Sequence, residues 1–350
     1  MRRFGFLKYL SVFTLPALAY FSFTHHGWFT LLPVAEAFVL IPMVELAFKP
    51  NPKNHSEEEE LKLLANKWFD VVVYLVVPVQ FLCLWYFLIS MQESDLSLLT
   101  IIGRVSAMGL LCGVMGINVA HELGHRKKKS ERFLAKMLLM TSLYMHFYVE
   151  HNRGHHKNVS TKDDPSSARF GETLYGFWFR SVFTTYISAW HLEFVRLKKR
   201  GIGKLSLHNE MLQFQVIQLA FVFLIYWLFG WPVVGYFIVA AVMGFILLET
   251  VNYIEHYGLQ REKKGDLYER VMPAHSWNSD HVIGRLVLFE LSRHSDHHYK
   301  ASRKYQILRH MEESPQMPTG YPGMMLMATI PPLWFKIMND RIADFKKSLL

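Results

Sequence analysis

His121-Glu122-Leu123-Gly124-His125 ends a long apolar stretch, and His151-Asn152-Arg153-Gly154-His155-His156 follows 26 residues later. Two further motifs complete the pattern: Asn252-Tyr253-Ile254-Glu255-His256-Tyr257-Gly258 and His294-Ser295-Asp296-His297-His298. Each motif lies just beyond, or well downstream of, an apolar run of membrane-spanning length. The pattern predicts one shared metal site built from nine histidines: His121, His125, His151, His155, His156, His256, His294, His297 and His298.

The composition favours a polytopic membrane protein over two soluble domains. Of the 350 residues 51% are hydrophobic and 15% aromatic, and the mean hydropathy is +0.13. The only two cysteines, Cys83 and Cys112, lie inside apolar runs. They can form neither a disulfide framework nor a thiolate metal site, so a transition metal must be held by imidazole and carboxylate.

Six segments have the roughly 20 apolar residues that a helix needs to cross the hydrocarbon of a bilayer. They are about 4–24, 28–48, 68–90, 97–119, 211–229 and 232–254. We therefore expect an all-α integral membrane protein with a histidine-rich helical cap, forming a single catalytic domain over 1–350. The apolar pieces 133–149 and 173–192 carry charged residues and predict amphipathic helices. Pro331-Pro332 breaks the last apolar run, 323–337, which predicts a capping element.

The basic residues set the expected orientation. The turns after the first, third and fifth segments contain no Lys or Arg. The opposite side carries Arg2, Arg3, Lys8, Lys49, Lys53, Arg126–Lys129, Arg196–Lys204 and Arg261–Lys264. Because cytoplasmic loops are rich in Lys and Arg, both termini and the parts 120–210 and 255–350 are predicted to be cytoplasmic. All four histidine motifs fall on this side.

Helical spacing predicts how the histidines share metals. His121 and His125 are four residues apart, as are His151 and His155, so each pair is expected on one helix face. His156 points about 100° away from His155 and can reach a second metal. His294, His297 and His298 repeat this spacing. Glu249, Asn252 and His256 form one stripe on the sixth segment, and Asn118 lies one turn before His121.

One alternative uses only the first motif. HELGH fits the HExxH pattern, in which two histidines hold zinc and the glutamate activates water. A zinc metalloprotease would leave seven of the histidines unexplained, because hydrolytic zinc needs three protein ligands. A non-catalytic metal-binding membrane protein is a second alternative. Nine imidazoles imply two metals, or one metal with more ligands than it needs, and imidazole by itself does not distinguish iron from copper, nickel or zinc.

The motifs HELGH, HNRGHH and HSDHH, with NYIEHYG between the last two, resemble those of the integral-membrane alkane monooxygenases, within the membrane fatty-acid desaturase and hydroxylase superfamily. The runs 273–281 and 318–321 resemble the alkane hydroxylases more specifically. The similarity covers about 118–335, while residues before 118 match mainly in hydropathy. After the second motif, Ser160–Pro165 lacks the proline often found there in the family.

The resemblance implies a non-haem di-iron monooxygenase with the nine histidines as iron ligands. Such an enzyme uses O₂ to hydroxylate the terminal methyl group of medium-chain n-alkanes to 1-alkanols. Related hydroxylases of alkylbenzene methyl groups or acyl chains, and lipid desaturases, are alternatives. The resemblance also implies the bacterial cytoplasmic membrane, and electrons from rubredoxin reduced by an NADH-dependent reductase. The chain carries no dinucleotide-binding or CxxC motif of its own. No nucleic-acid partner is expected.

Carboxylates beside the ligands are hypothesised to accept the outer N–H groups of the imidazoles. They are Glu122, Glu150, Glu255, Asp280 and Asp296. His275 and His281 lie in the polar run 274–281 near the motifs and are further candidates for contact with the site.

Two sequence features, a stripe of small residues and the basic runs, have more than one interpretation. Gly109, Gly113 and Gly116 belong to a small-residue stripe on the fourth segment, which predicts close helix packing or a substrate channel wall. The basic runs 126–129 and 196–204 are expected either to attract an acidic electron carrier or simply to serve topology and anionic lipid.

Overall fold

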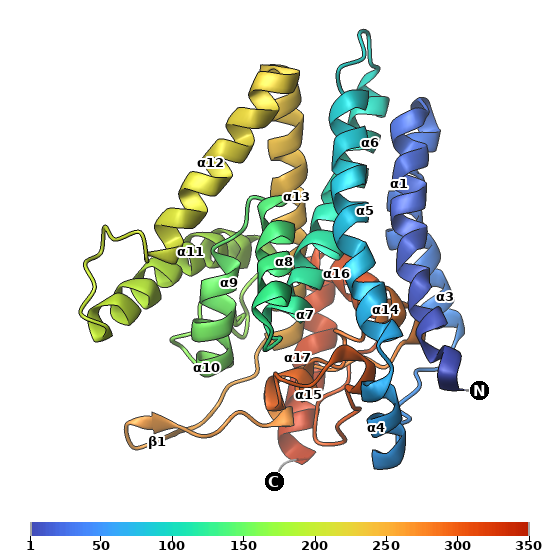
Figure 1. Ribbon diagram of the computed structural model, residues 1–350. Coiled ribbons are helices and arrows are strands. Elements are labelled where there is room, and N and C mark those ends of the chain that lie inside the picture. Colours follow the sequence, from blue (N-terminus) through green and yellow to red (C-terminus); the bar gives the residue numbers. More distant parts are fainter. Residues whose placement is uncertain (1, 349–350) are drawn as a thin grey trace. The chain divides into compact units, whose positions relative to one another are not determined.

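The computed structural model describes residues 2–348 (Figure 1). The chain divides into two compact units. Unit 1 contains the chain up to Val39 together with Asn66–Asn152 and Tyr186–Leu248. Unit 2 contains Leu40–Ala65, Arg153–Thr185 and the chain from Glu249 onward.

Unit 1 is helical and holds most of the long apolar segments. Its elements are η1 (Arg2–Phe13), α1 (Thr14–Thr24), η2 (Gly27–Leu31), α2 (Leu32–Ala35), α5 (Trp68–Ser90), α6 (Leu98–Leu111), η4 (Cys112–Ile117), α7 (Asn118–Gly124), α8 (Lys129–Met140), α9 (Phe147–Glu150) and α12 (Glu210–Phe229). Within residues 2–348, four further elements pass from one unit into the other, namely η3 (Glu36–Leu40), η5 (His151–His155), α11 (Leu174–Lys199) and α13 (Trp231–His256).

Unit 2 consists of short helices joined by long loops. Its elements are α3 (Ile41–Ala47), α4 (Glu57–Ala65), α10 (His156–Asn158), β1 (Lys263–Lys264), β2 (Leu267–Tyr268), η6 (Pro273–His275), α14 (Val282–Val287), α15 (His294–Tyr299), η7 (Tyr305–Ile307), α16 (Tyr321–Ala328) and α17 (Pro331–Ser348). The short turn η5 (His151–His155) leads into α10. The hairpin of β1 and β2 is a small departure from the expected all-α fold.

Within residues 2–348, six helices are long and apolar enough to cross a membrane. They are Phe4–Thr24, Gly27–Ala47, Trp68–Ser90, Leu98–Gly124, Glu210–Phe229 and Trp231–His256, close to the six predicted segments. The fourth continues to Gly124 and the sixth to His256, so His121 and His256 lie on final turns and His125 directly follows the fourth helix. α11 is not among them, in agreement with the prediction that 173–192 does not span.

Two predicted helices differ in detail. The expected helix 133–149 is interrupted because α8 ends at Met140 and Leu143 takes a left-handed φ of 51° before α9 begins. The last apolar run forms α16 and α17, with Pro331 as the first residue of α17. Proline fits that position because the first helical N–H has no partner within the helix.

A buried arginine joins the ends of two spanning helices in unit 1. Arg104 of α6 is fully buried and donates hydrogen bonds to the carbonyls of Ser90 (2.7 Å) and His25 (3.0 Å). Ser90 is the last residue of α5 and His25 directly follows α1, and carbonyls at these positions have no partner within their own helices. The guanidinium therefore caps both helices, which explains a charged residue in an apolar segment.

The core of unit 2 is aromatic and surrounds the end of α13. Tyr253 and Tyr257 pack against Trp334 of α17, with ring centroids 5.1 and 5.3 Å apart. The indole N–H of Trp277 donates to the carbonyl of Tyr257 at 3.0 Å. His256 lies between the two tyrosines in sequence and is itself fully buried. Large aromatic side chains thus fix the direction of the last turn of α13.

Candidate metal centre

Four histidines from three separate segments converge inside unit 2. His155, His256, His294 and His298 are all buried, and one nitrogen from each ring lies within 4.8 Å of the other three. The Nε2 atoms of His155 and His298 are 3.2 Å apart, as are those of His256 and His294. Four converging imidazoles form the donor set of a transition-metal site, so these residues fit a metal such as iron.

Two of these rings have a buried carboxylate on their outer nitrogen. Asp164 Oδ2 lies 2.9 Å from Nδ1 of His155, and Glu255 Oε1 lies 3.1 Å from Nδ1 of His294. The Glu255 carboxylate in turn accepts a hydrogen bond from the Tyr321 hydroxyl at 2.7 Å. Carboxylates on the outer nitrogens orient metal-binding imidazoles and raise their basicity. This arrangement leaves Nε2 of both rings directed at the shared centre.

The electrostatics of the group favour the ligand forms of its members. Burial, together with the neighbouring histidines, lowers the pKa of His298 well below its ordinary value. The ring therefore stays neutral, as a metal ligand must. Burial acts to raise the pKa of Asp164, but the facing His155 ring and the Ser167 hydroxyl outweigh it and the pKa is lowered. Asp164 is thus an ionised acceptor for His155.

The other five predicted ligands also gather with histidines of their own unit. In unit 1, the rings of His121 and His151 are 4.5 Å apart, and the Nε2 atoms of His125 and His151 are 3.1 Å apart. In unit 2, the Nε2 atoms of His156 and His297 are 3.2 Å apart. Every predicted ligand therefore faces at least one other.

One expectation about shared faces is wrong. His151 and His155 were expected on one helix face, but His155 joins the group of four while His151 contacts His121 and His125. The reason is local, because residues 151–155 form a π-helical turn, η5. A π-helical turn with i→i+5 hydrogen bonds departs from the 3.6-residue α-helical period from which the shared face was predicted.

Three of the carboxylates hypothesised to contact imidazoles bind arginines. Glu122 accepts from Arg126 at 2.6 Å, and Asp296 accepts from Arg303 at 2.6 Å. Asp280 accepts from Arg293 at 3.1 Å. Glu249 is buried and accepts hydrogen bonds from Ser181 and from Asn252, the latter at 3.2 Å. The remaining candidates, Asn118 and Glu150, are buried near the histidines of their motifs.

His275 and His281 are not members of the group of four. Nε2 of His275 lies 3.1 Å from Glu269, and Nδ1 of His281 lies 3.0 Å from the Ser279 hydroxyl. Both rings are thus engaged by neighbours in their own loops.

The glycine stripe is tightly packed within unit 1. A Cβ on Gly109 would meet the Met243 side chain at 2.6 Å, and one on Gly116 would meet Ser142 at 2.7 Å. A Cβ on Gly113 would lie 3.3 Å from the Gly244 carbonyl oxygen. These contacts favour the close-packing interpretation. A role of these glycines in a substrate channel stays a prediction.

The first basic run is less exposed than the sequence suggests. Arg126 is buried and forms ion pairs with Asp70 and Glu122 at 2.8 and 2.6 Å. Lys127, Lys128 and Lys129 are exposed. The positive surface of this run therefore begins at Lys127.

Sequence reasoning missed Asp164 as the partner of His155. It lies nine residues after His155, in a loop closed by a hydrogen bond from the Ser167 hydroxyl to Asp164 Oδ2 at 2.5 Å. Its only sequence signal is its place in 160–165, the stretch that departs from the family pattern. Tyr321, in the run 318–321, was likewise not recognised as the partner of Glu255.

The sequence matches known proteins over most of its length. Residues 96–327 match the family model described as fatty acid desaturase. The chain is 40% identical to alkane 1-monooxygenase 1 of Pseudomonas aeruginosa, over 92% of this chain and 85% of that protein. It is 37% identical to alkane 1-monooxygenase 2 of Alcanivorax borkumensis, over 99% and 92%.

A more distant relative is the xylene/toluene monooxygenase hydroxylase component of Pseudomonas putida, 27% identical over 95% of this chain and 87% of that protein. The much higher identity to the alkane 1-monooxygenases holds over nearly the whole length of both chains. The chain therefore belongs to the fatty acid desaturase family and, within it, to the family of the alkane 1-monooxygenases.

Proposed function

We propose that this protein is a non-haem di-iron monooxygenase that hydroxylates the terminal methyl group of medium-chain n-alkanes to 1-alkanols. The observation that carries the proposal is the buried group of four imidazoles, with carboxylates on the outer nitrogens of two of them. The alkane 1-monooxygenases to which the chain is similar supply the reaction and the substrate class. The zinc protease alternative is disfavoured, because the Glu122 carboxylate is bound by Arg126 rather than free to activate water.

The nine histidines are the proposed iron ligands. His155, His256, His294 and His298, which converge inside unit 2, would hold one iron. When bound, the iron pair supplies the O₂-dependent oxidation of the C–H bond. The chain contributes the neutral imidazoles, the carboxylates that orient them and an apolar surrounding. An alkane has no polar group, so only apolar packing and shape can place its methyl group.

The cleanest test follows a single turnover. Purified protein is reduced anaerobically, mixed with O₂ and n-octane, and its products are analysed for 1-octanol, with iron per chain measured by plasma mass spectrometry. We expect two irons per chain and 1-octanol. His298→Ala should lose iron and product, while His191→Ala, at an exposed histidine, should keep both. One zinc per chain, or no oxygenated product from a fully iron-loaded enzyme, would contradict the proposal.

We further propose that rubredoxin, reduced by an NADH-dependent reductase, supplies the electrons. The exposed lysines 127–129 and the exposed basic residues of 198–204 offer a positive surface for an acidic carrier. Reversing the charge of Lys127 and Lys128 should raise the KM for rubredoxin and flatten its salt dependence. The same change at Lys346 and Lys347 is the control. An unchanged KM would argue that these charges serve topology instead.

The proposed location is the bacterial cytoplasmic membrane, with both termini and the metal centre on the cytoplasmic side. A membrane-impermeant thiol reagent should label Asp266→Cys only in inside-out vesicles and Asp95→Cys only in right-side-out vesicles. The native cysteines are buried and give a low background. Labelling with the opposite sidedness would overturn the orientation.

A further inference from the structure

Both residues that flank His294 are linked by hydrogen bonds to one carboxylate, that of Asp280. Arg293 donates from Nε to Asp280 Oδ1 at 3.1 Å. On the other side, the Ser295 hydroxyl donates to Asn278 Oδ1 at 3.1 Å, and Asn278 Nδ2 donates to Asp280 Oδ2 at 3.3 Å. The start of α15 is thereby held on both sides of a proposed metal ligand.

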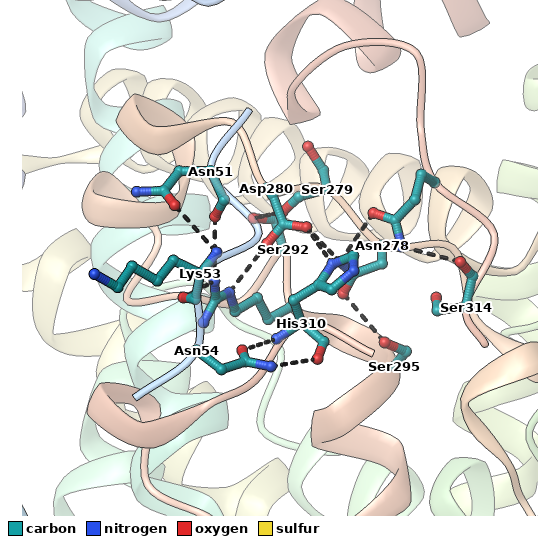
Figure 2. Close-up of polar contacts among 12 residues, drawn as sticks. Asn51, Lys53, Asn54, Asn278, Ser279, Asp280, Ser292, Ser295, His310 and Ser314 are labelled. Atoms are coloured by element: carbon teal, nitrogen blue, oxygen red, sulfur yellow. Dashed lines mark hydrogen bonds and ion pairs between the residues drawn. The ribbon is translucent and has the colours of Figure 1, made fainter. Parts of the chain in front are cut away.

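The same carboxylate is fixed by a second layer of contacts. His310 Nδ1 donates to Asp280 Oδ2 at 2.6 Å. His310 is itself held by Asn54, whose side chain accepts from the His310 backbone N–H at 2.7 Å and donates to its carbonyl at 2.9 Å. Figure 2 shows Asn51, Lys53 and Asn54 lying along this network. Arg293 also donates to the carbonyl of Lys53 at 3.0 Å.

Burial makes this network stiff. Arg293 and Asp280 are 1% and 4% exposed, and Asn278 and Ser295 are fully buried. Hydrogen bonds and ion pairs are electrostatically stronger in such surroundings than in water, and leaving one partner unpaired is costly. Each of these side chains therefore has a strong preference for its observed position.

α15 needs support of this kind. It has six residues, and isolated helices shorter than about 12–15 residues are marginal in water. Its own hydrogen bonds cannot fix the direction of three histidines. Arg293 is the residue directly before the helix, and its carbonyl accepts from the backbone N–H of His297 at 3.3 Å. Holding Arg293 therefore sets where the helix begins.

We propose that Asp280 is a positioning residue of the metal centre, which fixes the start of α15 through Arg293 and Asn278 and so directs His294 and His298 at the metal. Asp280 acts through other residues, rather than by accepting the outer N–H of a predicted metal ligand as the sequence suggested. This inference rests on the proposed function, because it requires that His294 and His298 are iron ligands.

Asp280→Asn tests this with little change in size. Metal-depleted protein is titrated anaerobically with ⁵⁷Fe²⁺, and bound iron is measured by mass spectrometry and Mössbauer spectroscopy. We expect affinity for one of the two irons to fall about tenfold, a typical loss when support of a metal ligand is removed, and one Mössbauer component to weaken. Glu172→Gln is the matched control, because it removes a carboxylate that pairs with Arg180 at 2.7 Å in the same unit. The control should bind two irons as the wild type does.

A second variant keeps the test decisive if Asp280→Asn does not fold. Ser295→Ala removes only the hydroxyl that links α15 to Asn278, and it should weaken the same iron by a smaller factor. If the folded variants bind both irons like the wild type, the positioning role is wrong. A wild type that binds one zinc instead would contradict the proposed function, and the same titration with zinc would still test Asp280.

Discussion

At the scale of single residues, the histidines depend on partners that their motifs do not contain. Asp164 Oδ2 lies 2.9 Å from Nδ1 of His155 and accepts from the Ser167 hydroxyl, while Asp164 Oδ1 accepts from the Ser166 backbone N–H. These bonds leave the carboxylate little freedom to turn away. His155 can therefore present Nε2 to a metal with its ring already oriented, which reduces the free-energy cost of binding.

Asp164→Asn should accordingly weaken metal binding by about 10- to 100-fold, because the amide is a poorer acceptor for the imidazole N–H. The measurement is the Fe²⁺ dissociation constant of metal-depleted protein under anaerobic conditions. Asp163→Asn is the control, since Asp163 is adjacent but exposed. Equal affinities for the two variants would show that Asp164 does not orient His155.

At the scale of elements, Arg126 joins three helices of unit 1 directly after the first histidine motif. Its guanidinium lies 2.8 Å from Asp70 of α5, 2.6 Å from Glu122 of α7 and 3.6 Å from Glu131 of α8.

Arg126→Met would leave these largely buried carboxylates without their cation, which typically costs about 3–5 kcal/mol. We expect a clearly lower Tm in detergent. Lys127→Met, at an exposed neighbour, should leave Tm unchanged, and equal Tm values would mean that the network does not stabilise the bundle.

The contact between α13 and the Leu98–Gly124 helix gives a second prediction at this scale. Gly113→Leu needs space that Gly244 and Leu247 already fill, and overpacking of this kind costs about 1–3 kcal/mol. We expect a lower yield and Tm with unchanged chain-length preference among n-alkanes. Gly235→Leu is the control, because a Cβ there meets nothing within 4 Å. A changed product profile at wild-type Tm would instead assign Gly113 to a substrate channel.

At the scale of the whole molecule, a metal would join segments that are far apart in the sequence. The group of four takes His155 from the second motif, His256 from α13, and His294 and His298 from α15. A metal that binds only the folded chain stabilises it by about 2.7 kcal/mol at a hundredfold excess over Kd. Chelation should therefore lower Tm by several degrees, and Fe²⁺ should restore it. In His298→Ala the change of Tm on chelation should be much smaller. If chelation leaves the Tm of the wild type unchanged, the metal does not contribute to the stability of the fold.

The six apolar helices, the nine histidines of the motifs and the distribution of basic residues can all be read from the amino-acid sequence. These depend on composition and spacing within a segment, so they can be read without knowing what packs against it. Other features appear only in the folded chain. His151 and His155 lie at the two ends of a π-helical turn, and Asp164 supports His155. Arg126 and Asp280 are buried in ion pairs. Such features depend on which distant side chains meet and how deeply they are buried, and neither follows from local periodicity.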